Sequence, residues 1–177
     1  MIRPNKFAHM ADGSVIVMLE RRDGTVLACF VDASDWPLVR GYRWCAIKGG
    51  NTFYAMTHVR KAGTRTTLQM HQLLLPDPEV DHINGKGCDN RRENLRAATR
   101  SQNNANQRKN SNNTSGFKGV HWRQDRSKWR ARIEVNGKHL HLGLYDAATD
   151  AARAYDQAAL QHFGQFARVN FPASKAA

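Results

Sequence analysis

The residues best suited to carry out a reaction lie in one stretch, PEVDHINGKGCDNRRENLRAATRSQNNANQ, which spans residues 78–107. An acid stands beside a histidine, Asp81-His82, and the asparagines Asn94 and Asn103 follow. A carboxylate and an amide oxygen are hard ligands, which suit Mg²⁺, Mn²⁺ or Ca²⁺ better than zinc. A histidine beside such an ion can act as a general base on water, and an asparagine can fix the loop and orient that histidine. Together these groups would form a minimal phosphodiester hydrolase.

The neighbouring residues predict a strand, a loop, a second strand and a helix. The loop is Gly-rich (Asn84 to Gly87), the second strand is a short apolar run (Leu95 to Ala98), and Thr99-Arg-Ser-Gln102 is a capping box that starts the helix. Asn103 then falls in the first helical turn, where it can face the end of the strand that carries the acid and the histidine. Taken singly, the same residues also fit a plain Asn-Gly turn, a cap and a solvated helix position. The catalytic interpretation rests on their combination at these spacings.

Residues 71–107 resemble the HNH nucleases, in the branch of phage homing endonucleases, through the Asp-His…Asn…Asn spacing and the DNRRENL core. The resemblance implies a ββα-metal site in which Asp81 and Asn103 bind one Mg²⁺ or Mn²⁺, with no zinc. It further implies that His82 activates a water and that Asn94 holds His82 in place. Two more residues, His71 and Arg100, are candidates for supporting the site. His71 lies in an apolar run and fits a packed structural histidine equally well. The candidates for clamping phosphate, or simply for solubility, are Arg91, Arg92, Arg96 and Arg100.

Composition narrows the class of protein. The 177 residues carry a net charge of +12 and are 41% hydrophobic. Such a basic chain most often meets nucleic acid and less often an anionic membrane. No run of eighteen apolar residues exists, and the N-terminus lacks the apolar core of a signal peptide. The three cysteines (Cys29, Cys45 and Cys88) are far apart and lack C-x-x-C spacing, which fits a reducing cytoplasm, bacterial or of a phage-infected host.

The positive charge is concentrated. Residues 100–141 contain ten Lys or Arg and two Asp or Glu, a net of +8, which favours a nucleic-acid contact surface over an ordinary solvated face. Within this region, residues 106–116 are rich in Asn and Ser and predict a linker. Arg108 and Lys109 could contact phosphates from it, or the segment could be a plain tether.

The N-terminal region predicts mainly strands. Its aromatic residues, such as Trp44 and Tyr54, are interpreted as core rather than as base-stacking platforms. We expect a hairpin over 14–31 around Asp23-Gly24, a short helix over 32–42 capped near Ser34 with Pro37 in its first turn, a strand pair over 43–48 and 52–59, a basic turn over 60–67, and a strand or short helix over 68–75.

A second unit begins at Phe117. Three antiparallel strands are expected, at 117–123, 129–135 and 138–145, with an Asn136-Gly137 type I′ turn between the last two. One face would hold apolar residues, including Leu140, Leu142 and Leu144, and the other Arg and His side chains. Asp146 would cap a helix that ends at Gly164 and packs an alanine-rich stripe, with Tyr155 and His162, on the apolar face.

Residues 115–172 are similar to the plant ethylene-response-factor domain, of the APETALA type, through FKGV, WRARI, LGLYDAATDAARAYDQAA and ARVNFP. The resemblance implies that the strands bind the DNA major groove. Several positions that are Arg or Trp in the plant domain are Lys or His here, and the first turn is two residues longer, so the plant target sequence does not transfer. The residues proposed to contact DNA, from the strands and the linker, are Arg108, Lys109, Lys118, His121, Arg123, Arg130, Arg132, Glu134, His139 and His141.

The sequence therefore predicts a modular α+β protein. Its parts would be a β-rich region (1–66), an HNH nuclease module (67–107), a linker (108–116) and an ethylene-response-factor-like DNA-binding domain (117–173). The predicted function is that of a homing-type endonuclease which acts on double-stranded DNA as a monomer, needs one divalent ion and no small-molecule cofactor, and nicks one strand. The alternatives are a non-catalytic DNA-binding transcriptional regulator and a nuclease that acts on RNA.

Overall fold

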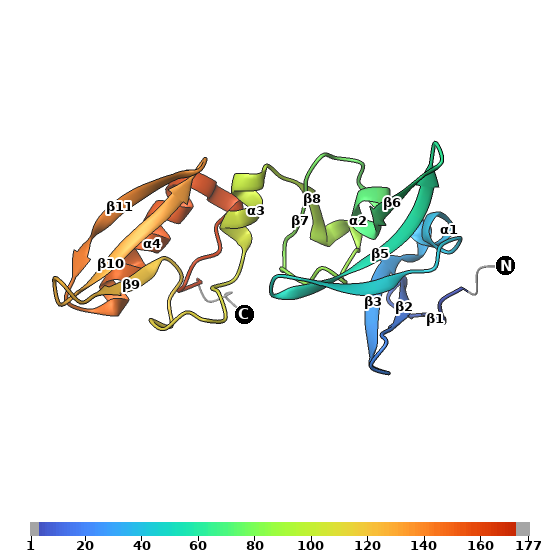
Figure 1. Cartoon of the computed structure of the whole chain (residues 1–177), viewed down its shortest axis with the longest axis horizontal. Coiled ribbons are helices and arrows are strands. Elements are labelled where there is room, and N and C mark those ends of the chain that lie inside the picture. The colour runs from blue at the N-terminus through green and yellow to red at the C-terminus, as the bar shows by residue number, and fades with distance from the viewer. Residues whose placement is uncertain (1–3, 173–177) are drawn as a thin grey trace. The chain divides into compact units, whose positions relative to one another are not determined.

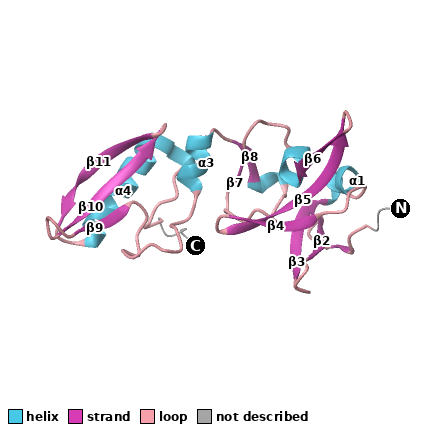
Figure 2. Cartoon of the chain, in the orientation of Figure 1, coloured by secondary structure: helices cyan, strands magenta, loops and turns pink. Residues whose placement is uncertain are grey.

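The structure, a computed structural model, describes residues 4–172 and divides into two compact units, Met1–Ala98 and Thr99–Ala177. Among the described residues, three antiparallel sheets and several short helices lie in the N-terminal unit, and one antiparallel sheet lies with a long helix in the C-terminal unit (Figures 1 and 2). The predicted α+β class is confirmed. The division into units falls between Ala98 and Thr99, and the module boundaries expected after residues 66, 107 and 116 stay predictions.

The N-terminal unit contains three sheets. β1 (Phe7–His9), β2 (Ser14–Glu20) and β3 (Val26–Asp32) form the first, in the order β1-β2-β3. The second has the order β4-β5-β6, and the third pairs β7 with β8. The bounds of the remaining elements are η1 (Ala33–Asp35), α1 (Trp36–Val39), β4 (Cys45–Gly49), β5 (Thr52–Lys61), β6 (Thr64–Gln69), α2 (Met70–Leu74), β7 (Val80–His82), η2 (Arg92–Asn94) and β8 (Leu95–Ala97).

One hydrophobic core joins these elements. The alternation of β2 buries Val15, Val17 and Leu19, and these residues belong to the same cluster as Trp44, Met70, Val80 and Leu95. Residues on both sides of position 66 therefore share a core. Burying a large apolar side chain stabilises a fold by roughly 1.5–3 kcal/mol, so this cluster supports the short β7–β8 pair, which could not stand alone.

Some local predictions for this unit need correction. The segment 60–67 is not a basic turn, because β5 and β6 continue through it, with Arg60 opposite Arg65, and the turn itself is only Ala62-Gly63. The segment 68–75 was predicted as a strand or a short helix, and it contains both. The strand β6 ends at Gln69, and the helix α2 begins at Met70. Pro37 lies in the first turn of α1 as expected, but Ser34 lies within η1 and does not cap the helix.

The C-terminal unit is a sheet covered by one long helix. It begins with α3 (Arg100–Asn106), followed by β9 (Val120–Arg123), β10 (Lys128–Val135) and β11 (Lys138–Tyr145) in the sheet order β11-β10-β9, and then by α4 (Ala148–Phe163) and η3 (Gly164–Phe166). Figure 2 shows α4 running along one face of this sheet. Both Asn136 and Gly137 have positive φ, as the predicted type I′ turn requires, and Gly164 at φ 51° ends α4 as predicted.

Close packing of α4 explains its alanines. Ala151, Ala152 and Ala159 are fully buried against β10, together with Tyr155. A Cβ placed at Gly119 would lie only 2.0 Å from the ring of Tyr155, so the sheet and the helix approach each other too closely there for a side chain. Asp146 does not cap the helix, because α4 begins at Ala148 and the Asp146 carboxylate instead pairs with Lys128 at 2.9 Å. The predicted inward position of His162 is wrong, since His162 is exposed and Phe163 is buried.

A β-bulge corrects the predicted face of Leu144. The register places Ala131 opposite Gly143 but Arg132 opposite His141, so Leu142 is an extra residue on β11. One inserted residue reverses the alternation beyond it. Leu144 consequently pairs with Arg130 on the face away from α4, where it is 39% exposed.

Candidate functional site

Two buried histidines meet in the N-terminal unit. His71 on α2 and His82 on β7 stack edge to face with 5.0 Å between ring centroids, and the ring of Tyr54 on β5 lies 5.8 and 5.7 Å from them. Burial, and then the neighbouring His82, lower the pKa of His71 to about 4. Burial also lowers the pKa of His82, against the opposing effects of a hydrogen bond with Asn90 and of the Asp81 and Asp89 charges. Both imidazoles are therefore neutral at pH 7, the form in which a histidine can accept a proton.

Asn90 forms a hydrogen bond with the His82 ring, and the sequence did not single it out. Its side chain is fully buried, and its Oδ1 lies 3.2 Å from His82 Nε2. The amide Nδ2 of Asn90 donates to Cys29 Sγ at 3.2 Å, which directs Oδ1 toward the histidine. An oxygen acceptor at that position favours the tautomer with a proton on Nε2 and leaves Nδ1 as the basic nitrogen. The Asp-Asn pair inside DNRRENL was the available signal, but nothing in it distinguishes Asn90 from Asn94.

The Asn94 side chain bonds to the backbone of the loop, whereas the amide that bonds to His82 Nε2 belongs to Asn90. Its Oδ1 accepts a hydrogen bond from the Asn84 backbone N–H at 2.9 Å, and its Nδ2 donates to the Asp89 carbonyl at 2.7 Å. The Ile83 N–H donates to the Asn94 carbonyl at 2.9 Å. These bonds fix the loop between β7 and η2, which is one of the two roles that the sequence suggested for this residue. The loop that Asn94 fixes also carries Asn90.

Asp81 lies beside His82 on β7 and opposite Arg96 on β8. Arg96 donates to the Oδ2 oxygen of Asp81 through both Nε, at 2.8 Å, and Nη2, at 2.7 Å. Asp81 is buried, at 3% relative exposure, and the Arg96 guanidinium helps to balance the charge of its carboxylate. Arg96 is thereby occupied by a carboxylate, which weakens its candidacy as a phosphate clamp.

The other arginine candidates of this unit are also paired with acids. Arg91 donates to both oxygens of Asp89, at 2.8 and 2.9 Å, and Arg92 binds Asp35 in the same bidentate way. The hydrogen bond from Arg91 lowers the pKa of the Asp89 carboxyl. Asp89 therefore remains ionised next to the histidine loop, where its charge favours a protonated His82 after proton transfer.

Asn103 lies on α3, in the unit that starts at Thr99. The predicted capping box is present, since Gln102 N–H donates to Thr99 Oγ1 and Thr99 N–H donates to Gln102 Oε1. Asn103 follows in the first turn, as expected. The ββα arrangement, which requires β7, β8 and α3 together, spans both units and stays a prediction, and so does the pairing of Asp81 with Asn103.

A divalent ion would depend on few protein ligands. Among residues 4–172, no group of three or more His, Cys, Asp and Glu side chains is arranged to hold a metal. One carboxylate and one amide oxygen nevertheless fit Mg²⁺, which keeps several waters and is often held by one or two carboxylates together with substrate phosphate. The donor set is therefore compatible with an ion that binds with the DNA rather than with a preformed metal cage.

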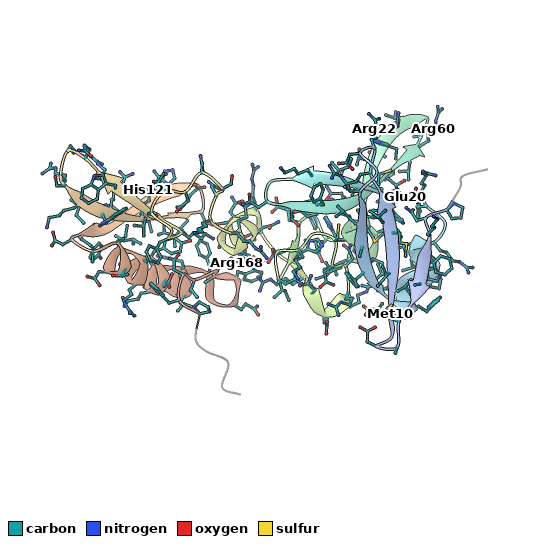
Figure 3. The ribbon with its side chains drawn as sticks, turned by 90° about the horizontal axis from the view of Figure 1, so that it is seen from below. Met10, Glu20, Arg22, Arg60, His121 and Arg168 are labelled. Carbon is teal, nitrogen blue, oxygen red and sulfur yellow. The ribbon has the colours of Figure 1, made fainter. Side chains whose placement is uncertain are left out.

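The exposed face of the β9–β11 sheet carries most of the predicted DNA contacts. Cross-strand pairs place His121 opposite Arg130, Arg132 opposite His141, and Glu134 opposite His139. Figure 3 shows His121 on the sheet, on the side away from α4. Burial, then the nearby Arg132 and Arg130, lower the pKa of His121. Arg123 belongs to the same face but is paired with Asp125 at 2.8 Å.

Lys118 is withdrawn from this face. Its ammonium donates to the carbonyl oxygens of Ala105, Gln107 at 2.7 Å and Asn104 at 3.4 Å, at the C-terminal end of α3. Burial, and then the charge of Arg168, lower the pKa of Lys118 to about 8. A cation that satisfies the last carbonyls of a helix is a C-terminal cap. The structure thus gives Lys118 a structural position that the sequence could not distinguish from a DNA contact.

No helix among residues 4–172 has the length and apolar character needed to cross a membrane.

Comparison with known proteins finds two family matches along this chain. Residues 75–105 match the HNH endonuclease family, and residues 115–165 match the AP2 domain. The chain is thus an HNH endonuclease-type protein that also carries an AP2 domain, the combination that the sequence resemblances indicated.

An uncharacterized HNH endonuclease of Acanthamoeba polyphaga mimivirus is 30% identical over 154 residues, which cover 86% of this chain and 79% of that protein. Protein 3.8 of Escherichia phage T7 is 35% identical over 89 residues, or 50% of this chain and 73% of the phage protein. The chain belongs to the HNH endonuclease family. The dehydration-responsive element-binding protein 2A of Arabidopsis thaliana is 46% identical over 67 residues, which are 37% of this chain and 20% of the plant protein.

Proposed function

We propose that this protein is a metal-dependent endonuclease that hydrolyses a DNA phosphodiester, one strand per chain, and that its AP2 domain directs it to duplex DNA. The observation that carries the proposal is the neutral, buried His82, which is held by Asn90 and stands beside Asp81 in the segment matched to HNH endonucleases. A histidine so held is suited to a general base, because its tautomer and orientation are fixed before substrate binds.

In the proposed reaction, Nδ1 of His82 takes a proton from a water, and the resulting hydroxide attacks phosphorus in line with the leaving 3′-oxygen. Asp89 and Asp81 favour the imidazolium formed. Asp81 and Asn103 would hold the divalent ion, Mg²⁺ or Mn²⁺, which supplies electrostatic stabilisation of the charge that develops on the phosphate and the leaving oxygen. Asn90 acts as a positioning residue through His82, and Asn94 acts through the loop.

The direct experiment is a nicking assay on supercoiled plasmid with Mg²⁺, with Mn²⁺ and with EDTA. His82→Ala is compared with His58→Ala, an exposed histidine on β5 of the same unit. Conversion to open circles that needs the ion, survives in His58→Ala and is lost in His82→Ala, with DNA binding retained, supports the proposal. Equal activity in the native chain and His82→Ala would refute the assignment of His82 as the base.

The AP2 match favours a second candidate, a DNA-binding regulator without nuclease activity, because the plant relatives that share this domain are named as transcription factors. Tight binding to duplex DNA with no cleavage under either ion would favour this candidate. Competition among duplex DNA, single strands and RNA tests the remaining alternative, a nuclease that acts on RNA.

A further inference from the structure

The C-terminal unit contains a groove that extends beyond the segment matched to the AP2 domain. The groove has a volume of about 1010 Å³ and is lined by α3, by the segment after it and by the exposed sheet face. The AP2 match covers residues 115–165 and the HNH match covers 75–105, so residues 106–114 lie outside both. One wall of the groove therefore includes a part of the chain to which no family match assigns a role.

That wall is fixed to its own unit. Ala105 packs in the core with Ile133 and Tyr155, and its carbonyl accepts a hydrogen bond from the Arg168 N–H at 3.3 Å. The Asn136 N–H donates to Ser101 Oγ at 3.1 Å. Arg168, labelled in Figure 3, also donates from Nε to Asn106 Oδ1 at 3.4 Å. With the Lys118 cap, these contacts hold α3 against the sheet and helix of the AP2 domain.

The segment after α3 is ordered rather than a plain tether. Lys118 Nζ donates to the Gln107 carbonyl, Lys109 Nζ donates to the Gly116 carbonyl at 2.8 Å, and Asn113 Nδ2 donates to the Phe117 carbonyl at 2.9 Å. These bonds fold residues 107–116 back on the unit. A wall that is ordered before binding loses little conformational entropy when a ligand arrives.

The chemistry of the lining points to an anionic ligand. Five Lys or Arg side chains line the groove against one acid, Glu134. Arg100 and Arg108 come from the α3 side, and Arg132 comes from the sheet. The uncharged lining between them consists largely of amides and hydroxyls, such as Asn104, which donate to phosphate oxygens without reading bases.

The aromatic residues argue against an unstacked single strand as the occupant. Tyr155 and Phe163 reach the groove, but they are buried, with 4% and 8% exposure. Single-strand sites depend on exposed aromatic rings on which bases stack. The groove instead combines cations and amides beside a sheet face suited to the major groove, and a backbone strand of duplex DNA flanks a major groove on each side.

We infer that the groove between α3 with residues 107–114 and the β9–β11 sheet holds one sugar-phosphate backbone of duplex DNA while the sheet occupies the adjacent major groove. The inference rests on the proposed function, because it assumes that the C-terminal unit binds duplex DNA. It adds sequence-independent phosphate contacts that the AP2 segment alone would lack, and it assigns Arg100 and Arg108 to phosphate.

The test measures binding of the full chain in EDTA to a duplex of mixed sequence, about 30 base pairs long. Fluorescence anisotropy gives the affinity between about 50 and 200 mM KCl. The test variant is Arg100→Gln with Arg108→Gln. The matched control is Arg126→Gln with Arg153→Gln, which removes the same charge from two exposed residues of this unit that do not line the groove.

Each phosphate contact that is lost reduces the slope of log K against log salt by about 0.9. The slope of log K against log salt should therefore be shallower by about two in the test variant, while the control keeps the native slope. Arg100→Lys with Arg108→Lys should restore the native slope, which separates loss of charge from misfolding. Equal slopes in the test and control variants would overturn the groove while leaving the proposed function standing, whereas a native chain that does not bind duplex DNA would overturn both.

Discussion

In the N-terminal unit, His71, His82 and Asn90 are buried, and they contact one another through the ring packing of the two histidines and the hydrogen bond between Asn90 and His82. In the C-terminal unit, Glu134 and His139 lie exposed on a sheet face, where their closest approach is 4.0 Å. A buried network fixes the geometry of its side chains, but its polar groups lose their hydration. The charged side chains of an exposed face keep their water and counterions, which they can exchange for DNA phosphates. Changes in the first unit should therefore reduce turnover, and changes in the second should reduce affinity.

The largest effect on turnover is expected from His82→Ala. Loss of a general base lowers the rate by about 10²–10⁴-fold. Single-turnover nicking with Mg²⁺ measures the rate, and anisotropy in EDTA measures affinity, which should stay near the native value. The control His58→Ala should match the native chain in both measurements. If affinity fell as far as the rate, the separation between a catalytic unit and a binding unit would be wrong.

A smaller effect is expected at Asn90, which acts through His82. Asn90→Ala removes the acceptor on Nε2 and should lower kcat by about 10- to 100-fold, by analogy with groups that orient a ligand histidine, with little change in KM. Asn90→Asp keeps an oxygen near Nε2 and should recover part of kcat. A purely structural role would instead lower the fraction of folded protein, with kcat per folded molecule unchanged, so activity is normalised to the folded fraction from circular dichroism.

The buried pair also predicts how stability depends on pH. The folded pKa of His71 is about 4, against an ordinary value of 6.5, so the unfolded chain takes up a proton first as pH falls. The stabilisation is complete above pH 6.5 and is lost progressively toward pH 4. Between pH 7 and pH 5 the free energy of unfolding of the N-terminal unit should fall by about 2 kcal/mol.

Urea unfolding at the two pH values measures this loss. His71→Gln removes the titrating group and should flatten the dependence, while His58→Gln, at an exposed site, should leave it unchanged. The same pH dependence in native and His71→Gln protein would show that the acid sensitivity comes from another group.

What the sequence could predict was set by local rules. The Thr99–Gln102 capping box and the Asn136-Gly137 turn depend on a few adjacent residues, and both are present. The bulge at Leu142 is different, because it follows from how β11 pairs with β10, and a strict alternation was the simpler expectation.

The site divides in the same way. Asp81 and His82 were predicted on a strand from their own neighbourhood, and they lie on β7. Asn90 is held near His82 by segments far away in the chain, since its side-chain amide donates to Cys29, 61 positions earlier, and its backbone N–H donates to the Phe30 carbonyl. The role of Lys118 likewise depends on α3, because the carbonyls at the end of that helix come within hydrogen-bond distance of its ammonium only when the unit is folded. Contacts between distant segments decide these roles, and no local pattern contains them.

Substitution of Lys118 tests whether this cation stabilises the C-terminal unit rather than binding DNA. Lys118→Met keeps the apolar stem and removes the donor to three carbonyls at the end of α3. Carbonyls left without a partner should lower the stability of the C-terminal unit by about 1–2 kcal/mol. Urea unfolding, compared with Lys138→Met at an exposed strand end, measures the difference. Equal stability of the two variants would return Lys118 to the set of DNA contacts that the sequence suggested.

The smallest expected effect is at the exposed pair Arg123–Asp125. The carboxylate binds Arg123 through two contacts of 2.8 Å and holds it in place on the sheet surface. Asp125→Asn removes a negative charge and leaves Arg123 available to phosphate, so DNA binding should tighten modestly, with a salt slope steeper by about 0.9.

The matched control is Asp150→Asn, which makes the same charge change on α4 of the same unit. It should leave the slope close to native, because Asp150 lies on the helix that covers the other face of the sheet. If both variants tightened binding equally, only net charge would matter. If the Asp125 variant alone steepened the slope, Arg123 would be a phosphate contact that its ion pair keeps partly occupied in the native protein, and the exposed face would be tuned by its own acids just as the buried site is tuned by Asp89.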